Sequence, residues 1–325
     1  MRFVKANSWL LVLMALLIVI PIVVPSMAFV NIVAEMLIMA LFAVSVNLLI
    51  GYTGVVSFGH SAFFAIGSYT TGIMLQRMGE SLPLAIPVVL IVGMVLSGII
   101  ALVIGYFCTR LTAVYFAFLT LAFSQVIYAI IIKWKGLTGG DQGLVGGVPK
   151  PPLNLFGWAM DMTSPFTLYY FIVVVVCGAL LVVKLVTDSP FGWVLRGIRD
   201  NAERMKFLGI NVRRYMIIVF VISGVFTGLA GGLIGLHISG AYPDHAYWTK
   251  SAEPIFMIMV GGMRVFAGPI LGAIIVTELS AYLSSYIGLW GLIFGGILIV
   301  FLMVSRQGIL DVLTRKWPIF KRLGF

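Results

Sequence analysis

The chain has 325 residues, of which 61% are hydrophobic and only 10% are charged, and its mean hydropathy is +1.13. A soluble protein of this length could not bury so many apolar side chains, because too much of its surface stays in contact with water. The formal net charge is +10, but no separate basic domain is present that would bind nucleic acid. These properties exclude a soluble protein and a nucleic-acid partner, and they indicate a helical membrane protein with several spans.

Ten apolar segments follow one another along the chain, and we expect each to form a helix. The eighth is too short to cross a bilayer as one straight helix, and the third is rich in glycine and small polar residues, so we expect both to be broken or re-entrant. We therefore predict an all-α membrane bundle that forms a single transmembrane domain over residues 1–325. The segments are 9–24, 28–50, 53–76, 84–108, 111–132, 165–186, 215–237, 251–263, 266–287 and 289–304.

The N-terminal run allows two interpretations. Arg2 and Lys5, the apolar residues after them and the small residues at 26–28 resemble a cleavable signal peptide. Because another long apolar run follows at once, we favour an uncleaved first span. With all ten segments crossing, most of the 21 Lys and Arg lie on the side of the termini, which predicts cytoplasmic N- and C-termini and an external loop at 133–164.

The densest charge lies in the middle of the chain, in "GWVLRGIRDNAERMKFLGINVRRY" (192–215). Asp188 or Ser189 can cap a helix that begins at Pro190, and Gly209 is a plausible stop. The result is one amphipathic helix over 190–208, lying either in the lipid headgroup layer or against a soluble partner. The interleaved acids favour the partner, because a lipid anchor gains nothing from carboxylates. The residues predicted for this contact are Arg196, Arg199, Asp200, Asn201, Glu203, Arg204 and Gly209.

Two glycine-interrupted segments, one in each half of the chain, predict an inverted repeat and a translocation path, because unwound backbone in a bilayer must be buried in protein or line a cavity. The alternative is close helix packing, with His60 as a buried imidazole bonded to a serine. For the glycines at 224–235, packing is the favoured interpretation. The predicted path residues are Ser57, Phe58, Gly59, His60, Ser61, Gly67, Gly261 and Gly262.

Other chemistry is sparse. The dipeptide Gly-Lys does not occur, so the chain has no phosphate-binding loop with which to use ATP. No catalytic motif is visible, and the histidines and the two cysteines are not spaced as a metal site, so no cofactor is expected. Glu35 and Glu278 lie within apolar segments and should face protein or water. The glycine-rich stretch 138–152 is expected to form no core and to be either a connector or a rim that meets a binding protein.

The segments "GYTGVVSFGHSAFFAIGSYTTG" (51–72), "LTGGDQGL" (137–144) and "GWVLRGIRDNAERMKFLGINVRRYMIIVFVISGVFTGLAGGL" (192–233) resemble permease subunits of ABC importers for branched-chain amino acids, of the LivM type. The resemblance covers about residues 30 to 305. It implies a bacterial inner-membrane subunit, without enzymatic activity, that transports leucine, isoleucine or valine, and a coupling helix at 190–208. The implied partners are a second homologous permease, two ATP-binding subunits, a periplasmic substrate-binding protein and membrane lipid. A permease for urea or short amides, an ion-coupled transporter and, more remotely, a membrane-embedded enzyme remain as alternatives.

Overall fold

The computed structural model describes residues 17–21, 23–24, 26–78, 85–111, 113–144, 147–155, 158–286, 290–304 and 308–316. The chain divides into two compact units. Unit 1 comprises Met1–Asn47, Tyr169–Lys184 and Glu253–Phe325, and unit 2 comprises Leu48–Leu168 and Leu185–Ala252.

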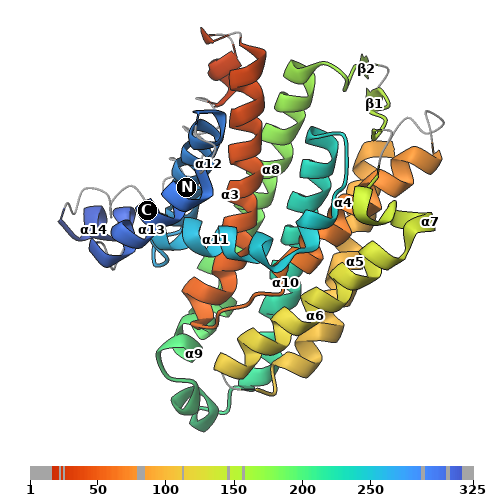
Figure 1. The fold of residues 1–325 in the computed structure, drawn as a ribbon. Helices are drawn as coiled ribbons and strands as arrows, with labels where there is room; N and C mark the ends of the chain where they lie inside the picture. The colour runs from red at the N-terminus through yellow and green to blue at the C-terminus, as the bar shows by residue number, and fades with distance from the viewer. Residues whose placement is uncertain are drawn as a thin grey trace. The chain divides into compact units, whose positions relative to one another are not determined.

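Helices make up most of the described chain (Figure 1). The mostly apolar helices of at least 14 residues are α3 (Met27–Thr53), α4 (His60–Met78), α5 (Ala85–Cys108), α6 (Ala113–Lys133), α8 (Pro165–Asp188), α10 (Val212–His237), α11 (Trp248–Gly261), α12 (Gly268–Tyr286) and α13 (Trp290–Val304). More polar or shorter are α7 (Lys135–Thr138), α9 (Pro190–Phe207), α14 (Ile309–Lys316) and the 3₁₀ turns η1 (Gly140–Gln142) and η2 (Pro243–Ala246). Strands β1 (Leu153–Leu155) and β2 (Trp158–Met160) form a small antiparallel hairpin, with Leu155 opposite Trp158.

Within the described residues, five helices are long and apolar enough to cross a bilayer: α3, α5, residues Val114–Lys133 of α6, α8 and α10. The prediction of an all-α, multi-pass membrane bundle is confirmed. Nine of the ten predicted segments correspond to helices, whereas most of the first, 9–24, lies outside the described residues. The eighth segment is α11, which has only 14 residues and contains Pro254.

The third predicted segment is interrupted at its start and not along its length. Helix α3 ends at Thr53, residues 54–59 are not helical, and α4 then continues without interruption from His60 to Met78 (Figure 1). A corresponding interruption, 262–267, separates α11 from α12. We call residues 54–59 the first break and residues 262–267 the second break.

In unit 2, helices α4, α5 and α10 pack closely because glycine removes the side chains at their crossings. A Cβ atom at Gly67 of α4 would collide with the carbonyl oxygen of Gly228 of α10, and a Cβ at Gly231 would collide with that of Phe64. The prediction that the α10 glycines serve helix packing is confirmed. The same contact shows that Gly67, predicted to line a path, is buried where two helices meet.

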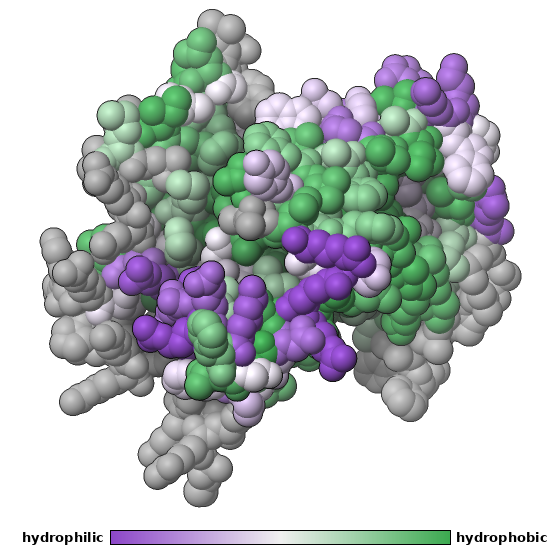
Figure 2. Space-filling model, turned by 90° about the horizontal axis from the view of Figure 1, so that it is seen from below, coloured by the Kyte–Doolittle hydropathy of each residue, from purple (hydrophilic) through white to green (hydrophobic). Residues whose placement is uncertain are grey.

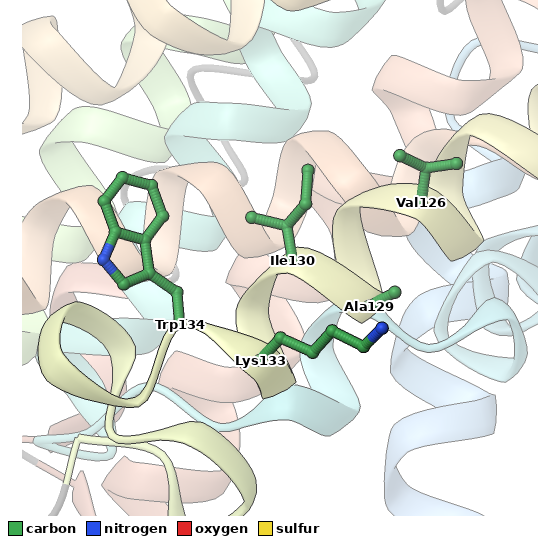
Figure 3. A pocket seen from close by; sticks show the side chains of 5 residues that line it. All are labelled: Val126, Ala129, Ile130, Lys133 and Trp134. Atoms are coloured by element: carbon green, nitrogen blue, oxygen red, sulfur yellow. The ribbon is translucent and has the colours of Figure 1, made fainter.

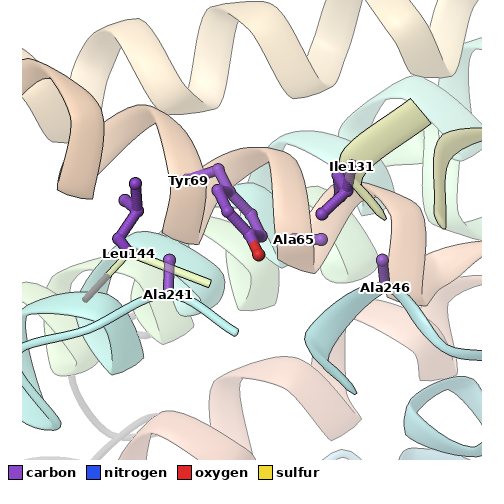
Figure 4. Packing of buried hydrophobic residues seen from close by; sticks show 6 residues of the cluster. All are labelled: Ala65, Tyr69, Ile131, Leu144, Ala241 and Ala246. Carbon is purple, nitrogen blue, oxygen red and sulfur yellow. The ribbon is translucent and has the colours of Figure 1, made fainter. Parts of the chain in front are cut away.

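The loop after α6 also packs on the rest of unit 2, which corrects the expectation that residues 138–152 form no core. Leu144 is 7% exposed and Val148 is 4% exposed. Their backbone N–H groups donate to the carbonyls of Ala241 and Ser239, each over 2.9 Å. Figure 4 shows Leu144 close to Tyr69 and Ala241 in a buried cluster, because pairing its backbone allows this loop to bury apolar side chains.

Unit 1 contains α12 and α13, which contact each other, and α14, which contacts α12. Its N-terminal residues are joined to α8, since the hydroxyl of Tyr169 donates to the carbonyl of Leu17 over 2.8 Å. Helix α14 packs through Leu310 and Thr314, both of which are buried. The short amphipathic α14 is therefore part of unit 1.

Candidate functional site

Helix α9 begins where the sequence predicts, but its first residue is capped differently. Ser189 occupies the N-cap position and Pro190 the first turn. The hydroxyl of Ser189 donates back to the carbonyl of Val186 over 2.7 Å, so it does not accept from the first turn of α9. At Gly192 a Cβ would collide with the carbonyl of Thr187, so the tight turn from α8 into α9 requires glycine there.

The prediction of one continuous helix over 190–208 is wrong at Asn201. This residue has φ −163° and ψ 97°, which is extended backbone inside the helical stretch. Its Oδ1 accepts from the N–H of Arg204 over 2.8 Å. Asn201 therefore ends the first part of α9 and caps a short second part, because asparagine is a strong N-cap residue.

The end of α9 follows the prediction for Gly209. Gly209 has φ +82°, and its N–H donates to the carbonyl of Lys206 over 2.9 Å. The N–H of Ile210 donates to the carbonyl of Met205 over 3.1 Å. These two bonds form a Schellman motif, in which glycine takes the left-handed position that other residues avoid.

Two of the predicted coupling residues face the rest of unit 2. Arg196 Nη2 donates to the carbonyl of Thr187 over 2.7 Å, and its guanidinium lies over the ring of Tyr52. Arg199 Nη1 donates to the carbonyl of Gly51, and Arg199 Cγ lies 3.1 Å from the position of a Cβ at Gly54. These arginines therefore join α9 to the end of α3 and to the first break.

The remaining predicted coupling residues are exposed and face away from the rest of unit 2. Beside them, Phe207 is 92% exposed and Leu208 is 70% exposed, although both are large and apolar. Figure 2 views the molecule from the side on which α9 lies in Figure 1, and hydrophilic side chains gather there among hydrophobic ones. We call this exposed set the α9 tip: Asp200, Asn201, Glu203, Arg204, Lys206, Phe207, Leu208 and Gly209.

The first break is held by side chains of unit 2. Gly54 has φ +75°, which turns the chain out of α3. The N–H of Phe58 donates to Thr120 Oγ1 of α6 over 3.2 Å, and the N–H of Gly59 donates to Ser57 Oγ over 3.2 Å. A Cβ at Gly59 would lie 3.0 Å from Thr120, so this part of the break passes close to α6.

The residues directly after the first break are enclosed. His60 Nε2 and Ser223 Oγ of α10 are 2.8 Å apart, and the rings of Phe63 and Phe220 meet the imidazole edge-on. The N–H of Ser61 donates to the hydroxyl of Ser251 over 2.7 Å. The hydrogen bond between His60 and Ser223 is the one expected if His60 is a buried imidazole bonded to a serine. That His60 lines a path stays a prediction.

The second break begins with the other predicted pair. A Cβ at Gly261 would collide with the carbonyl of Gly268, and Gly262 has φ +116°. Both residues are buried. The N–H of Arg264 lies 3.4 Å from Asp311 Oδ2 of α14, whereas the Arg264 side chain is exposed. Asp311 was not predicted from the sequence, where its only signal is an acid in the first turn of a short amphipathic helix.

Glu35 and Glu278, the two carboxylates predicted to face protein or water, differ in exposure. Glu35 of α3 is half-buried, in agreement with the expectation that it faces protein. Glu278 lies near the middle of α12 and is exposed on this chain. A carboxylate at membrane depth is costly against lipid, so Glu278 requires water or another protein beside it.

A shallow pocket lies on α6, away from the predicted path residues. It is lined by Val126, Ala129, Ile130, Lys133 and Trp134, which come from the last turns of this helix and the residue after it (Figure 3). Val126 and Ile130 are exposed there. One helix supplies the whole lining, so the pocket is a depression in an apolar outer surface.

Several apolar membrane-spanning helices, two breaks in the helical backbone and one polar helix with an exposed tip define a multi-pass membrane transport protein. The chain belongs to the family described as branched-chain amino acid transport system / permease component, which matches residues 28–303.

Three relatives illustrate the range of similarity. The high-affinity branched-chain amino acid transport system permease protein LivM of Escherichia coli strain K12 is 24% identical over 95% of this chain and 76% of its own. A probable branched-chain amino acid transport permease protein LivH of Methanocaldococcus jannaschii is 25% identical over 88% of this chain and 91% of its own. The ribose import permease protein RbsC of Haemophilus influenzae is 23% identical over 80% of this chain and 76% of its own. No solved structure matches the chain significantly.

Proposed function

We propose that this chain is the permease subunit of an ATP-driven importer for leucine, isoleucine and valine in a bacterial inner membrane. Family membership and the similarity to LivM proteins support the substrate class. The chain has no phosphate-binding loop, so the energy comes from ATP hydrolysis on a separate subunit. The permease itself has no catalytic residue and needs no cofactor or metal.

The working importer contains this chain, a second homologous permease and two ATP-binding subunits, with a periplasmic substrate-binding protein outside. Both termini and α9 lie in the cytoplasm, because most Lys and Arg then lie inside. The loop 133–164 faces the periplasm, where its hairpin and α7 are available to the binding protein. Lipid covers the remaining apolar surface, including the depression on α6.

The observation that carries the proposal is the division of α9 into two oppositely directed sets of side chains. Arg196 and Arg199 hold carbonyl groups of unit 2, whereas the α9 tip presents acids, bases and exposed Phe207 and Leu208. Two exposed apolar side chains beside charges of both signs suit a protein groove better than an anionic lipid surface. The α9 tip thus docks on the ATP-binding subunit.

Arg199 gives the docked helix a route to the transport path. Its guanidinium holds the Gly51 carbonyl at the end of α3, and its Cγ contacts Gly54 at the start of the first break. Movement of α9 when the ATP-binding subunits close is therefore passed to residues 54–59. The path residues at 57–61 and at 261–262 open in response, with the substrate carried between the two permease subunits.

A competition experiment distinguishes branched-chain amino acids from other candidate substrates. One relative is named as a ribose import permease, so a polar solute is an alternative substrate. Urea and short amides are further alternatives. Apolar side chains offer few directional contacts, so the binding protein selects the solute and the path is weakly selective. Uptake of labelled leucine is expected to be inhibited by isoleucine and valine and unaffected by ribose, urea or acetamide.

The test uses the complete complex, purified from native membranes and reconstituted in vesicles with its binding protein. Leucine accumulation should require ATP on the side of the ATP-binding subunits and should survive an uncoupler. Two results would overturn the proposal and favour an ion-coupled transporter: leucine accumulation by the isolated chain, or leucine accumulation that an uncoupler abolishes and that ATP does not affect.

A matched pair of variants tests the α9 tip. Replacing Phe207 and Glu203 with alanine should leave membrane insertion intact, since both side chains are exposed, and should reduce the ATP-binding subunit that co-purifies. The control is Phe118→Ala, which removes an exposed aromatic side chain from α6. Equal recovery of the ATP-binding subunit from both variants would contradict docking at the tip.

A further inference from the structure

Helix α14 contacts the second break through one carboxylate. Asp311 lies in the first turn of α14, and the N–H of Arg264 points to its Oδ2 over 3.4 Å. Partial burial raises the pKa of Asp311, and the N–H groups of Arg264, Val265 and Met263 around the carboxylate oppose that rise. The measured hydrogen bond is the one from the N–H of Arg264, so a carboxylate of the same chain lies against the backbone of the second break.

The backbone at this contact leaves no space for side chains. Gly262 has φ +116°, and a Cβ there would lie 3.0 Å from both Cγ and Oδ1 of Asp311. Gly308, which precedes α14, would place a Cβ 2.5 Å from the Cα of Gly262. Two glycines thus allow α14 to approach the second break closely enough for its carboxylate to reach the N–H groups.

Other elements of unit 1 contact the same break, so its shape depends on several contacts. The side-chain amide of Asn47 in α3 donates to the carbonyl of Met263 over 3.4 Å. The ammonium of Lys184 in α8 lies 5.1 Å from the ring centre of Phe266. Among these contacts, Asp311 is the side chain that faces the N–H groups of the break.

We propose that Asp311 is a positioning residue for transport, which holds the second break in its folded conformation through the N–H of Arg264 and close contact with Gly262. Helix α14 then serves as an internal support of the path. The proposal rests on the proposed function for its link to transport, but its structural part does not. Loss of the carboxylate frees the backbone of the second break while α14 keeps its contact with α12 and its buried Leu310 and Thr314.

The experiment measures backbone freedom separately from transport. In the full complex, Cys108 and Cys177 are replaced by alanine and Val265, which is half-buried, by cysteine. The labelling rate with N-ethylmaleimide is compared between Asp311, Asp311→Asn, Asp311→Ala and Asp311→Glu. A hydrogen-bonded charge contributes enough that its loss should raise labelling about tenfold in the Asn and Ala variants. Asp311→Glu should stay near the parent rate.

Leucine uptake is measured on the same variants and normalised to the protein in the membrane. Asp311→Asn and Asp311→Ala should lower the maximal uptake rate, and Asp311→Glu should restore most of it. The control is Asp244→Asn, an exposed acid of unit 2 outside the loop 133–164. Unchanged labelling in Asp311→Ala would overturn the positioning role. Increased labelling with normal uptake would show that α14 holds the break but that transport does not depend on it. If the parent complex itself transports no leucine, the proposed function fails and the labelling result still stands.

Discussion

The two breaks in the helical backbone are held by side chains of opposite charge. At the first, a guanidinium from α9 binds the carbonyl of Gly51 and contacts Gly54. At the second, the carboxylate of Asp311 from α14 accepts from the N–H of Arg264, two residues after Gly262. In both cases the break opens with a glycine at positive φ, and a short polar helix supplies the charge.

The difference follows from the polarity of the backbone that each break exposes. The last carbonyls of a helix have no partner within it and form the negative end of the helix dipole, so the end of α3 attracts a cation. The residues ahead of α12 present N–H groups, which attract an anion. Each charge is therefore matched to its local backbone and not to the other charge.

The strongest test of this matching is an exchange of the two charges. Arg199→Asp turns a carboxylate toward the Gly51 carbonyl, and the lost charged hydrogen bond plus repulsion should lower uptake on the order of a hundredfold. Arg199→Ala, which only removes the bond, should lower it about tenfold. Adding Asp311→Arg to Arg199→Asp should not restore uptake.

Initial leucine uptake per inserted complex measures these variants, with ATP hydrolysis recorded in parallel. Hydrolysis that continues while uptake falls identifies a defect in transmission at Arg199. Recovery of uptake in the exchanged pair would show that the two charges act on each other, and local matching would then be wrong.

Smaller effects are expected from alanine at the glycines that open the breaks. Gly54→Ala and Gly262→Ala place a Cβ 3.1 Å from Arg199 and 3.0 Å from Asp311, respectively, at positive φ. The left-handed backbone alone costs an L-residue about 1–2 kcal/mol, and displacement of the charged side chain adds to it. We expect uptake to fall about fivefold to tenfold in each.

Gly147→Ala is the matched control, because Gly147 has φ +79° and no atom within 4 Å of a Cβ. It carries the backbone strain without the contact. If all three variants show the same decrease in uptake and in thermal stability of the purified complex, strain accounts for the effect and the contacts with Arg199 and Asp311 add nothing.

The long-range order of the chain could be predicted because hydrophobic segments and punctuating residues are local signals. Pro190 and Gly209 mark the limits of α9, and nine apolar segments correspond to helices. Gly54 and Gly262 begin stretches whose glycine content already indicated interruption. Each of these signals acts through the backbone of the residue that carries it, or through its immediate neighbours.

The contacts across the fold could not be predicted, because they join residues far apart in the sequence. Arg199 had the pattern of an exposed charged face, yet it bonds to Gly51, 148 positions away. Asp311 is 47 positions from Arg264. Leu144 lay in a glycine-rich stretch with no periodicity, and its burial depends on a backbone partner at Ala241. A periodic pattern indicates which face is polar, but it does not indicate what that face meets.

The smallest effect is expected at Asn201, where α9 bends and the α9 tip begins. Asn201→Ala removes the acceptor for the N–H of Arg204, and a lost N-cap costs about 1 kcal/mol. Alanine also favours a straight helix, so the tip should point in another direction while Arg199 stays on Gly51. We expect leucine uptake to fall about twofold to fivefold, with ATP hydrolysis less affected. Asn201→Asp keeps the cap and should behave like the parent. If Asn201→Ala transports normally, the bend is not needed to direct the tip, and the two parts of α9 act as one helix.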